Sequence, residues 1–167
     1  VRNPSAAFTR PTEDEWYKAA YSDPANPGTY HAHPTGSPIA TSCTAPNALP
    51  DSANCDGAVG ATTDVGSYPG SASANAAFDL GGNVWEWTES IAGVNRRIRG
   101  GSFTSPAATL TATSSGFDED PLAADAELGF RVVPEPGPIG GLVAGWTALA
   151  AAAATRRRPP LDTNRTS

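Results

Sequence analysis

The sequence predicts a domain that combines one short helix with a few strands and otherwise consists of loops. Three observations lead to this prediction. Residues 12–21 carry the signals of a helix, residues 84–88, 96–103 and 128–133 carry those of strands, and residues 22–76 show neither a helical nor a strand period. The chain of 167 residues is long enough for one domain of ordinary size.

The helix is expected to begin after Thr12, because Thr12 and Glu15 have the spacing of a capping box. Acidic residues follow Thr12 directly and lie at the positive end of the helix dipole. The helix is expected to end around Tyr21, before Asp23-Pro24, since proline disfavours helical geometry in the residue before it. Trp16 is expected to anchor this helix on a core.

The stretch from Phe78 to Thr88 holds two glycines and two of the four tryptophans. Gly81 and Gly82 permit a tight turn with positive φ, and the residues after them alternate as in a strand. Trp85 and Trp87 fall on one face, which we expect to be buried, and a carboxylate is aimed from the other face.

Side-chain oxygens gather around this turn. Asp79, Asn83 and Glu86 supply them, and a glycine turn exposes carbonyl groups, so the stretch is a candidate site for Ca²⁺. Asn54 and Asp56 form a second, weaker candidate. A glycine hairpin with its polar residues in water is the alternative, which spacing alone favours.

Candidate cross-links lie within the loop-rich residues 22–76. Cys43 and Cys55 could close a loop and stabilise the fold by roughly 3 kcal/mol in an oxidising compartment. His31 and His33 could instead join the thiols around a transition metal. Histidines at the surface, with cysteines that are bridged or merely packed, are the interpretation that we favour.

The composition excludes some classes of function. The net charge is −6, so the basic footprint of a nucleic-acid-binding protein is absent. The chain has two histidines, both far from residues 104–127, and no nucleophile–base pairing is seen there. The excess of arginine over lysine indicates a GC-rich bacterial coding sequence. Because the chain starts at Val1 and lacks methionine, we expect a fragment of a longer product.

The end of the chain differs in kind. Residues 139–154 are sixteen apolar or small residues, followed by three arginines at 156–158. A membrane span needs about twenty residues, so this segment is barely long enough. The arginines favour a cytoplasmic position for that end, which places the preceding domain on the exported side. A buried helix of the globular domain is the alternative.

Two parts of the chain resemble known families. Residues 9–133 resemble the C-terminal half of the formylglycine-generating enzyme (sulfatase-modifying factor) domain family. Residues 133–158 are similar to the PEP-CTERM sorting tail of exported bacterial proteins, with its signal at Pro134-Glu135-Pro136. The motifs that match the first family are Pro11-Thr12-Glu13-Asp14-Glu15-Trp16, Thr63-Asp64-Val65-Gly66-Ser67-Tyr68-Pro69, Gly82-Asn83-Val84-Trp85-Glu86-Trp87, Arg99-Gly100-Gly101-Ser102-Phe103 and Leu128-Gly129-Phe130-Arg131.

The first resemblance implies a C-type-lectin-like α+β fold with little regular secondary structure. Residues 1–133 would form a domain truncated at its N-terminus, because the first half of the family's domain is missing from this chain. The tail adds a sorting and anchoring segment at 134–158 with a C-terminal hydrophobic helix. Residues 159–167 are expected to be a disordered tail.

The same resemblance implies binding sites. One calcium ion would be held by the side chains of Asp79 and Glu86 and the carbonyls of Gly82 and Val84. A weaker second calcium site would involve Asn54 and the carbonyl of Cys55. Trp85 and Ser102 match residues that line the family's pocket.

Two positions bear on catalysis. The enzymes of the family place two copper-binding cysteines after the Arg-Gly-Gly-Ser motif, whereas Ser105 and Leu110 stand there in this chain. Neither residue can replace a thiolate at a soft copper centre. Copper and formylglycine-forming activity are therefore not expected.

The expected function is that of a non-catalytic, exported module at the cell surface or in the extracellular matrix of a Gram-negative-type bacterium. Residues 139–154 would hold it in the membrane, a sorting protease would act at Pro134-Glu135-Pro136, and the ligand would be a peptide or an extracellular polymer. The alternative is a metal-dependent, oxidase-like enzyme that uses ligands from the missing half, or from His31, His33 and the cysteines.

Overall fold

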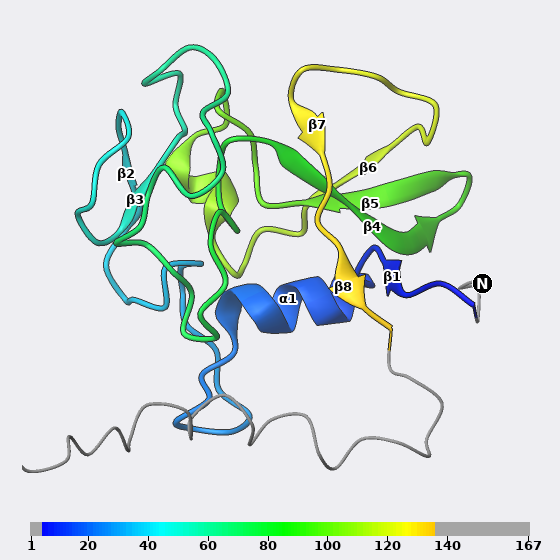
Figure 1. Ribbon diagram of the computed structural model, residues 1–167, viewed down its shortest axis with the longest axis horizontal. Coiled ribbons are helices and arrows are strands. Elements are labelled where there is room, and N and C mark those ends of the chain that lie inside the picture. Colours follow the sequence, from blue (N-terminus) through cyan, green and yellow to red (C-terminus); the bar gives the residue numbers. More distant parts are fainter. Residues whose placement is uncertain (1–4, 136–167) are drawn as a thin grey trace, which may run out of the picture. The chain divides into compact units, whose positions relative to one another are not determined.

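The computed structural model describes residues 5–135. Loops make up most of this part of the chain, as expected, and residues 22–76 contain only two strands of two residues each. The elements in chain order are β1 (Phe8–Thr9), α1 (Glu13–Tyr21), β2 (Ser42–Cys43), β3 (Ser52–Ala53), β4 (Trp85–Ala92), β5 (Asn95–Arg99), the 3-10 helix η1 (Ala107–Leu110), β6 (Phe117–Glu119), β7 (Leu128–Gly129) and β8 (Val133–Pro134) (Figure 1).

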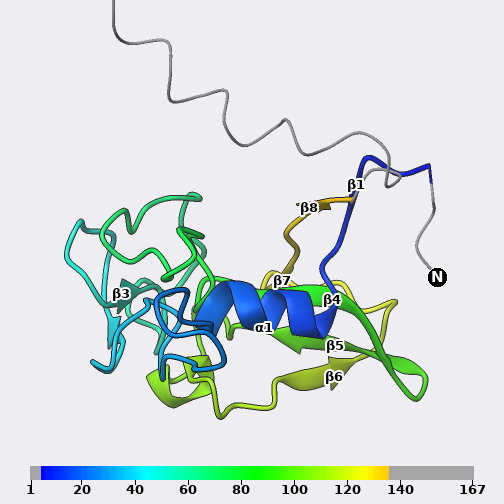
Figure 2. The same ribbon diagram turned by 90° about the horizontal axis from the view of Figure 1, so that it is seen from below.

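A four-stranded sheet in the order β6-β5-β4-β7 is the main structural layer. β4 pairs antiparallel with β5 and parallel with β7, and β5 pairs antiparallel with β6. β1 and β8 form a separate antiparallel pair, so the two ends of the described chain lie side by side (Figure 2). The connection between β6 and β7 arches out from the sheet (Figure 1).

The predicted helix is confirmed from cap to end. The Thr12 hydroxyl accepts a hydrogen bond from the Glu15 amide at 3.2 Å, and the Glu15 carboxylate accepts one from the Thr12 amide at 2.8 Å. α1 ends at Tyr21 and lies across β4 and β5 (Figure 2). Trp16, at 1% exposed, anchors the helix on the core.

Most of the buried apolar side chains of the described residues fall into two small clusters. Trp16, Ala20 and Tyr21 of α1 form the first together with Leu80. The second is made of Ala53, Cys55 and Leu110, with Cys43 packed against it. Cys43 and Cys55 are joined by a disulfide, so a covalent bond fastens the loop-rich region to the second cluster.

The expectation for the two faces of β4 was wrong. Glu86 and Thr88 are 6% and 0% exposed, whereas Trp85 and Trp87 on the other face are only partly buried. Alternation identifies which residues share a face but not which face meets the core. A buried carboxylate is tolerated here because Arg131 and Trp16 supply its partners.

The strands predicted after the turn at Gly81 and Gly82 are confirmed only in part. β5 ends at the glycine pair, where Gly100 and Gly101 have φ of 98° and 80°, values that favour glycine. Residues 128–133, expected as one closing strand, instead contribute all of β7 and the first residue of β8, which lie in two different sheets. Arg131 lies between them and directs its guanidinium to Glu86.

No helix within residues 5–135 is long and apolar enough to cross a membrane. The hydrophobic helix expected at 139–154 and the tail at 159–167 lie outside the described residues, as does Pro136 of the sorting signal.

Candidate functional site

The glycine turn before β4 is a junction between three segments of the chain. Gly82 has a φ of 75°, and a Cβ atom there would lie 2.2 Å from the Asn54 carbonyl oxygen, so only glycine fits. The Asn83 amide donates to that same carbonyl at 2.8 Å, and the Gly82 amide donates to the Gly100 carbonyl at 2.9 Å. The side-chain oxygen of Asn83 accepts from the Thr63 amide at 2.8 Å. The turn therefore holds the loop region against the end of β5.

Glu86 is the buried carboxylate beside this turn. Its Oε2 accepts hydrogen bonds from the indole Nε1 of Trp16 at 2.6 Å and from Nε of Arg131 at 2.5 Å, and its Oε1 accepts from Nη2 of Arg131 at 2.5 Å. Nη2 also donates to the main-chain carbonyl of Asp79 at 3.0 Å. The guanidinium of Arg131 is thus bound by the Glu86 carboxylate and by the Asp79 carbonyl.

This arrangement does not fit the calcium set expected from Asp79, Gly82, Val84 and Glu86. Both oxygens of Glu86 are bound to other groups, and Asp79 Oδ2 accepts from the Gly66 amide at 2.7 Å. The Gly82 carbonyl accepts from the Val84 amide at 2.8 Å. Calcium would have to displace Arg131 from Glu86. Within residues 5–135, no group of three or more His, Cys, Asp or Glu side chains could hold a metal ion.

The weaker candidate at Asn54 fits an ion better. Asn54 is 1% exposed, and its Nδ2 donates to the Ala61 carbonyl at 2.8 Å and to Asn83 Oδ1 at 3.1 Å. Its Oδ1 is buried and accepts no hydrogen bond. An unpaired buried oxygen is unfavourable, so this atom is suited to a cation or a water molecule.

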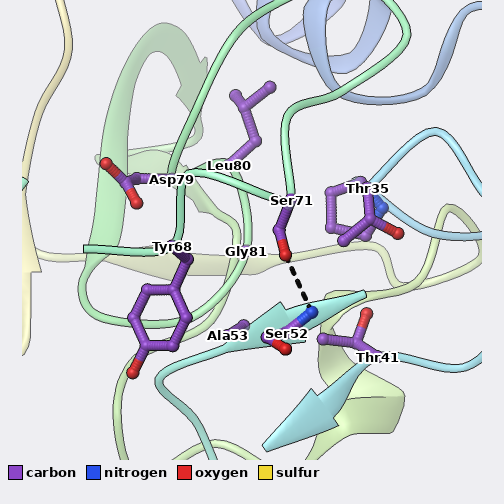
Figure 3. Close-up of a pocket in the computed structure, with 10 residues that line it drawn as sticks. Thr35, Thr41, Ser52, Ala53, Tyr68, Ser71, Asp79, Leu80 and Gly81 are labelled. Atoms are coloured by element: carbon purple, nitrogen blue, oxygen red, sulfur yellow. Dashed lines mark hydrogen bonds between the residues drawn. The ribbon is translucent and has the colours of Figure 1, made fainter. Parts of the chain in front are cut away.

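A small polar cavity lies next to the turn (Figure 3). Ser52 and Ser71 meet across it, with the Ser52 amide donating to Ser71 Oγ at 2.8 Å, and Thr41, Tyr68 and Asp79 lie around it. Its volume is about 10 Å³, which is room for about one water molecule. It is too small for an organic ligand.

The larger hollow, of about 760 Å³, is lined by residues of all four strands of the sheet and of the segments 104–109 and 123–127. Trp85 and Phe117 form an aromatic wall, with ring centroids 5.1 Å apart and planes at 86°. We call this hollow the edge cleft, because both edge strands of the sheet, β6 and β7, contribute to its lining. Its lining residues are Trp85, Ile98, Thr104, Ser105, Pro106, Thr109, Phe117, Asp118, Glu119, Ala123, Ala124, Asp125, Glu127 and Leu128.

Glu127 lines the edge cleft and connects it to the rest of the site. Its carboxylate accepts hydrogen bonds from the hydroxyls of Ser102 and, at 2.7 Å, of Thr104. Its carbonyl accepts from the Trp85 amide at 2.7 Å, which fixes it beside β4. The two predicted pocket residues therefore have different positions, because Trp85 lines the cleft and the fully buried Ser102 lies beneath it.

The two positions that bear on copper chemistry lie near each other, since a Cβ atom added to Gly101 would be 2.9 Å from Leu110 Cδ1 and 3.3 Å from Ser105 Cβ. Ser105 lines the edge cleft, and its hydroxyl lies 3.1 Å from that of Ser102. Leu110 has no exposed surface and packs against the disulfide in the second core cluster. The disulfide also removes both thiols from the metal site imagined with His31 and His33. His31 lies 3.8 Å from Asp23, and neither histidine lines the cleft.

Sequence reasoning missed three residues of this region. Phe117 and Glu127 lie within residues 104–127, a stretch that looked like featureless Ser, Thr, Ala and acid, and their roles depend on β6 pairing with β5 and β7 pairing with β4. The signal for Arg131 was its place in the Leu128–Arg131 motif, which says nothing of its partner. None of these contacts is local in sequence.

These features define a class: a small, loop-rich domain with one helix on a short mixed sheet and a cleft lined by residues of all four strands of that sheet. Residues 5–136 match the family described as the sulfatase-modifying factor enzyme 1-like domain, FGE-sulfatase. The chain belongs to this family.

The chain is similar to known proteins in sequence and in fold. The chain is 30% identical over 162 residues to hercynine oxygenase of Mycolicibacterium thermoresistibile, a match that covers 78% of this chain and 34% of that enzyme. The structure is similar to that of CarF, with a TM-score of 0.52 and 26% identity over 80% of this chain and 49% of CarF. It is also similar to PvdO from Pseudomonas aeruginosa, with a TM-score of 0.51 and 19% identity over 75% of this chain and 51% of PvdO.

The chain therefore spans about a third of the curated relative and about half of the two solved chains. The small helix content, the mixed sheet and these structural neighbours are consistent with the predicted C-type-lectin-like fold.

Proposed function

We propose that this chain is a non-catalytic member of the sulfatase-modifying factor family that binds a ligand in the edge cleft. The observation that carries the proposal is the pair Ser105 and Leu110, which stand where the resemblance places two copper-binding cysteines. Leu110 is sealed in the core and Ser105 carries a hydroxyl, so these positions offer no thiolate pair. The edge cleft lies beside Ser105, which is one of its lining residues.

The lining of the edge cleft supports binding. Concave sites that combine aromatic surface with a few polar groups are the usual form of small-ligand sites. Trp85 and Phe117 provide the aromatic surface, and Thr104 and Glu127 provide hydrogen-bonding groups. The ligand class expected from the sequence, a peptide or an extracellular polymer, is suited to such a surface.

A structural calcium ion at Asn54 is part of the proposal. The unpaired Oδ1 of Asn54 would contribute one oxygen, and the Cys55 carbonyl, which accepts from the Ala58 amide at 3.0 Å, would contribute a second through its other lone pair. Water would complete the coordination that calcium requires. Bound there, the ion would have a structural role. It would hold the loop closed by Cys43 and Cys55 against the turn at Gly81 and Gly82. Asp79 and Glu86 would bind no ion.

Export and anchoring remain proposals that rest on residues 133–158. Their resemblance to a sorting tail supports a surface or matrix location, with membrane contact through 139–154 and cleavage at Pro134-Glu135-Pro136. Fractionation of the source bacterium tests this proposal. The tail-processed protein is expected outside the cytoplasm, and an intact chain found in the cytoplasm would remove the proposal.

A ligand screen observed by NMR tests the binding function. With the full chain labelled with ¹⁵N, peptide and oligosaccharide fragments that bind are expected to shift the amide signals of Trp85, Thr104 and Leu128. Trp85→Leu should weaken these hits at least tenfold, whereas Trp87→Leu, on the same strand but outside the cleft lining, should leave them unchanged. Hits that map only to other surfaces would contradict the proposal.

A metal-dependent oxidase is the second candidate, favoured by the 30% identity to hercynine oxygenase. Within the described residues, no cluster of three metal-binding side chains supports it, so its ligands would have to come from elsewhere. Iron titration with an oxygen electrode tests this candidate. Stoichiometric tight binding together with oxygen consumption would favour the oxidase over the binding module.

A further inference from the structure

The edge cleft is anionic as well as aromatic. Of the residues that line it, Asp118, Glu119, Asp125 and Glu127 carry carboxylates, and none is Lys, Arg or His. Arg97 neutralises one of them, because its Nε lies 3.0 Å from Asp118 Oδ1. Arg96 stands opposite Glu119 in the β5–β6 pair but does not line the cleft, and its Nη1 donates to the Glu89 carbonyl at 3.0 Å.

The carboxylates line the same cleft as the aromatic rings of Trp85 and Phe117. Phe117 is 59% exposed, and its ring meets that of Trp85 edge to face, so part of the aromatic surface is open to a ligand. The face of an indole or phenyl ring attracts a cation through its quadrupole. Aromatic faces and carboxylates therefore favour the same kind of ligand group from two directions.

Glu127 fixes negative charge in the cleft. Two hydroxyl groups, of Ser102 and Thr104, donate to its Oε2, and these bonds hold the carboxylate in one position. Because Ser102 is fully buried and Thr104 is exposed, this charge lies at the boundary between the interior and the cleft.

We propose that the edge cleft selects an organic cation: an ammonium or guanidinium group, carried by a small molecule or by a basic side chain of a peptide. This proposal rests on the proposed function, since it names the ligand class of the same cleft. An anionic ligand would face at least three carboxylates without a lining base, and a neutral ligand would leave their charge unused.

A panel of matched probes tests the selection. Choline and its uncharged isostere 3,3-dimethylbutan-1-ol differ mainly in charge, propionate supplies an anion, and lysine amide and arginine amide distinguish the side-chain source from the small-molecule source. Binding to the full chain is followed by NMR shifts at Trp85, Thr104 and Leu128. At least one cation is expected to bind roughly tenfold more tightly than the neutral isostere and the anion.

Two further measurements separate charge selection from nonspecific attraction. The variant Glu119→Gln/Asp125→Asn is expected to weaken cation binding several-fold, whereas Asp64→Asn, an exposed acid outside the cleft, should have no effect. Added salt should weaken cation binding and leave the neutral isostere unaffected, because it screens the exposed carboxylates.

The outcomes are distinguishable. Equal or tighter cleft binding of the neutral probe or propionate would overturn the cation proposal and leave the binding function intact. Cations that shift only signals outside the cleft, or no signals, would also overturn it, and the fragment screen described above would then decide the binding function by itself.

Discussion

The guanidinium of Arg131 binds both carboxylate oxygens of Glu86, with Nε–Oε2 and Nη2–Oε1 distances of 2.5 Å. The two residues are 45 positions apart, and their side chains are 22% and 8% exposed, respectively. This pair joins β4 to the segment between β7 and β8. It also explains how a carboxylate can face the core, where Trp16 donates the third hydrogen bond.

Removing Arg131 should destabilise the domain strongly. Arg131→Leu leaves the Glu86 carboxylate buried without its cation, and such losses cost about 3–5 kcal/mol. Arg131→Lys keeps the charge but loses the bidentate geometry, so its free energy of unfolding should lie between those of Arg131→Leu and the wild type. Urea denaturation measures both. A loss below about 1 kcal/mol for Arg131→Leu would show that the pair contributes only as an exposed salt bridge does.

Calcium should act through Asn54. Because an ion that binds only the folded state stabilises by mass action, Ca²⁺ is expected to raise the Tm of the wild-type chain relative to EDTA. The increment should persist in Asp79→Asn and disappear in Asn54→Leu, whatever the starting Tm of each variant. An increment lost in Asp79→Asn but kept in Asn54→Leu would reverse the assignment, and no increment in the wild type would remove calcium from the account.

The disulfide should be a main support of the loop region. Cys43 and Cys55 are 12 residues apart, and closing a loop of this size stabilises a fold by roughly 3 kcal/mol. Reduction with dithiothreitol should therefore lower the Tm of the wild type. The variant Cys43→Ser/Cys55→Ala should start from the lower value and not respond to the reductant. A wild-type Tm that is indifferent to the reductant at full thiol release would contradict this prediction.

Stability should fall at alkaline pH because of Tyr21. Burial raises the pKa of this phenol well above its usual value, and its hydroxyl donates to the Leu110 carbonyl at 2.9 Å. Above pH 10 the unfolded chain loses the phenol proton while the folded chain keeps it, so unfolding is favoured as pH rises. Below pH 10 this contribution is fully present.

The matched variant Tyr21→Phe isolates this effect. It should lose about 1 kcal/mol at neutral pH through the missing hydrogen bond. Between pH 10 and 11 its free energy of unfolding should decline less steeply than that of the wild type. Parallel declines in urea denaturation would show that Tyr21 does not control the alkaline limit.

Local signals in the sequence predicted the local structure well. Thr12 and Glu15 form a capping box because they are three residues apart in one helical turn, and Gly82 adopts a positive φ because glycine has no Cβ atom. The side of β4 that meets the core could not be read in this way. Glu86 lies inward because Arg131 and Trp16 reach it from distant segments, and alternation carries no information on such partners.

The candidate site was predictable only in part for the same reason. Trp85 was found through its motif, and it lines the edge cleft. Phe117 and Glu127 reach the cleft because β6 pairs with β5 and β7 pairs with β4, a topology that no local pattern specifies. Asn54 was the weaker calcium candidate by spacing, yet its unpaired oxygen becomes apparent only when the fold buries it.

Copper(I) titration of the full chain, with oxygen uptake measured in the presence of a cysteine-containing peptide, tests the central claim most directly. With Ser105 and Leu110 at the two positions that need thiolates, we predict no stoichiometric tight binding of copper and no oxygen uptake above that of the peptide with free copper. One copper bound per chain together with peptide-dependent oxygen uptake would contradict the account of this protein as a binding module.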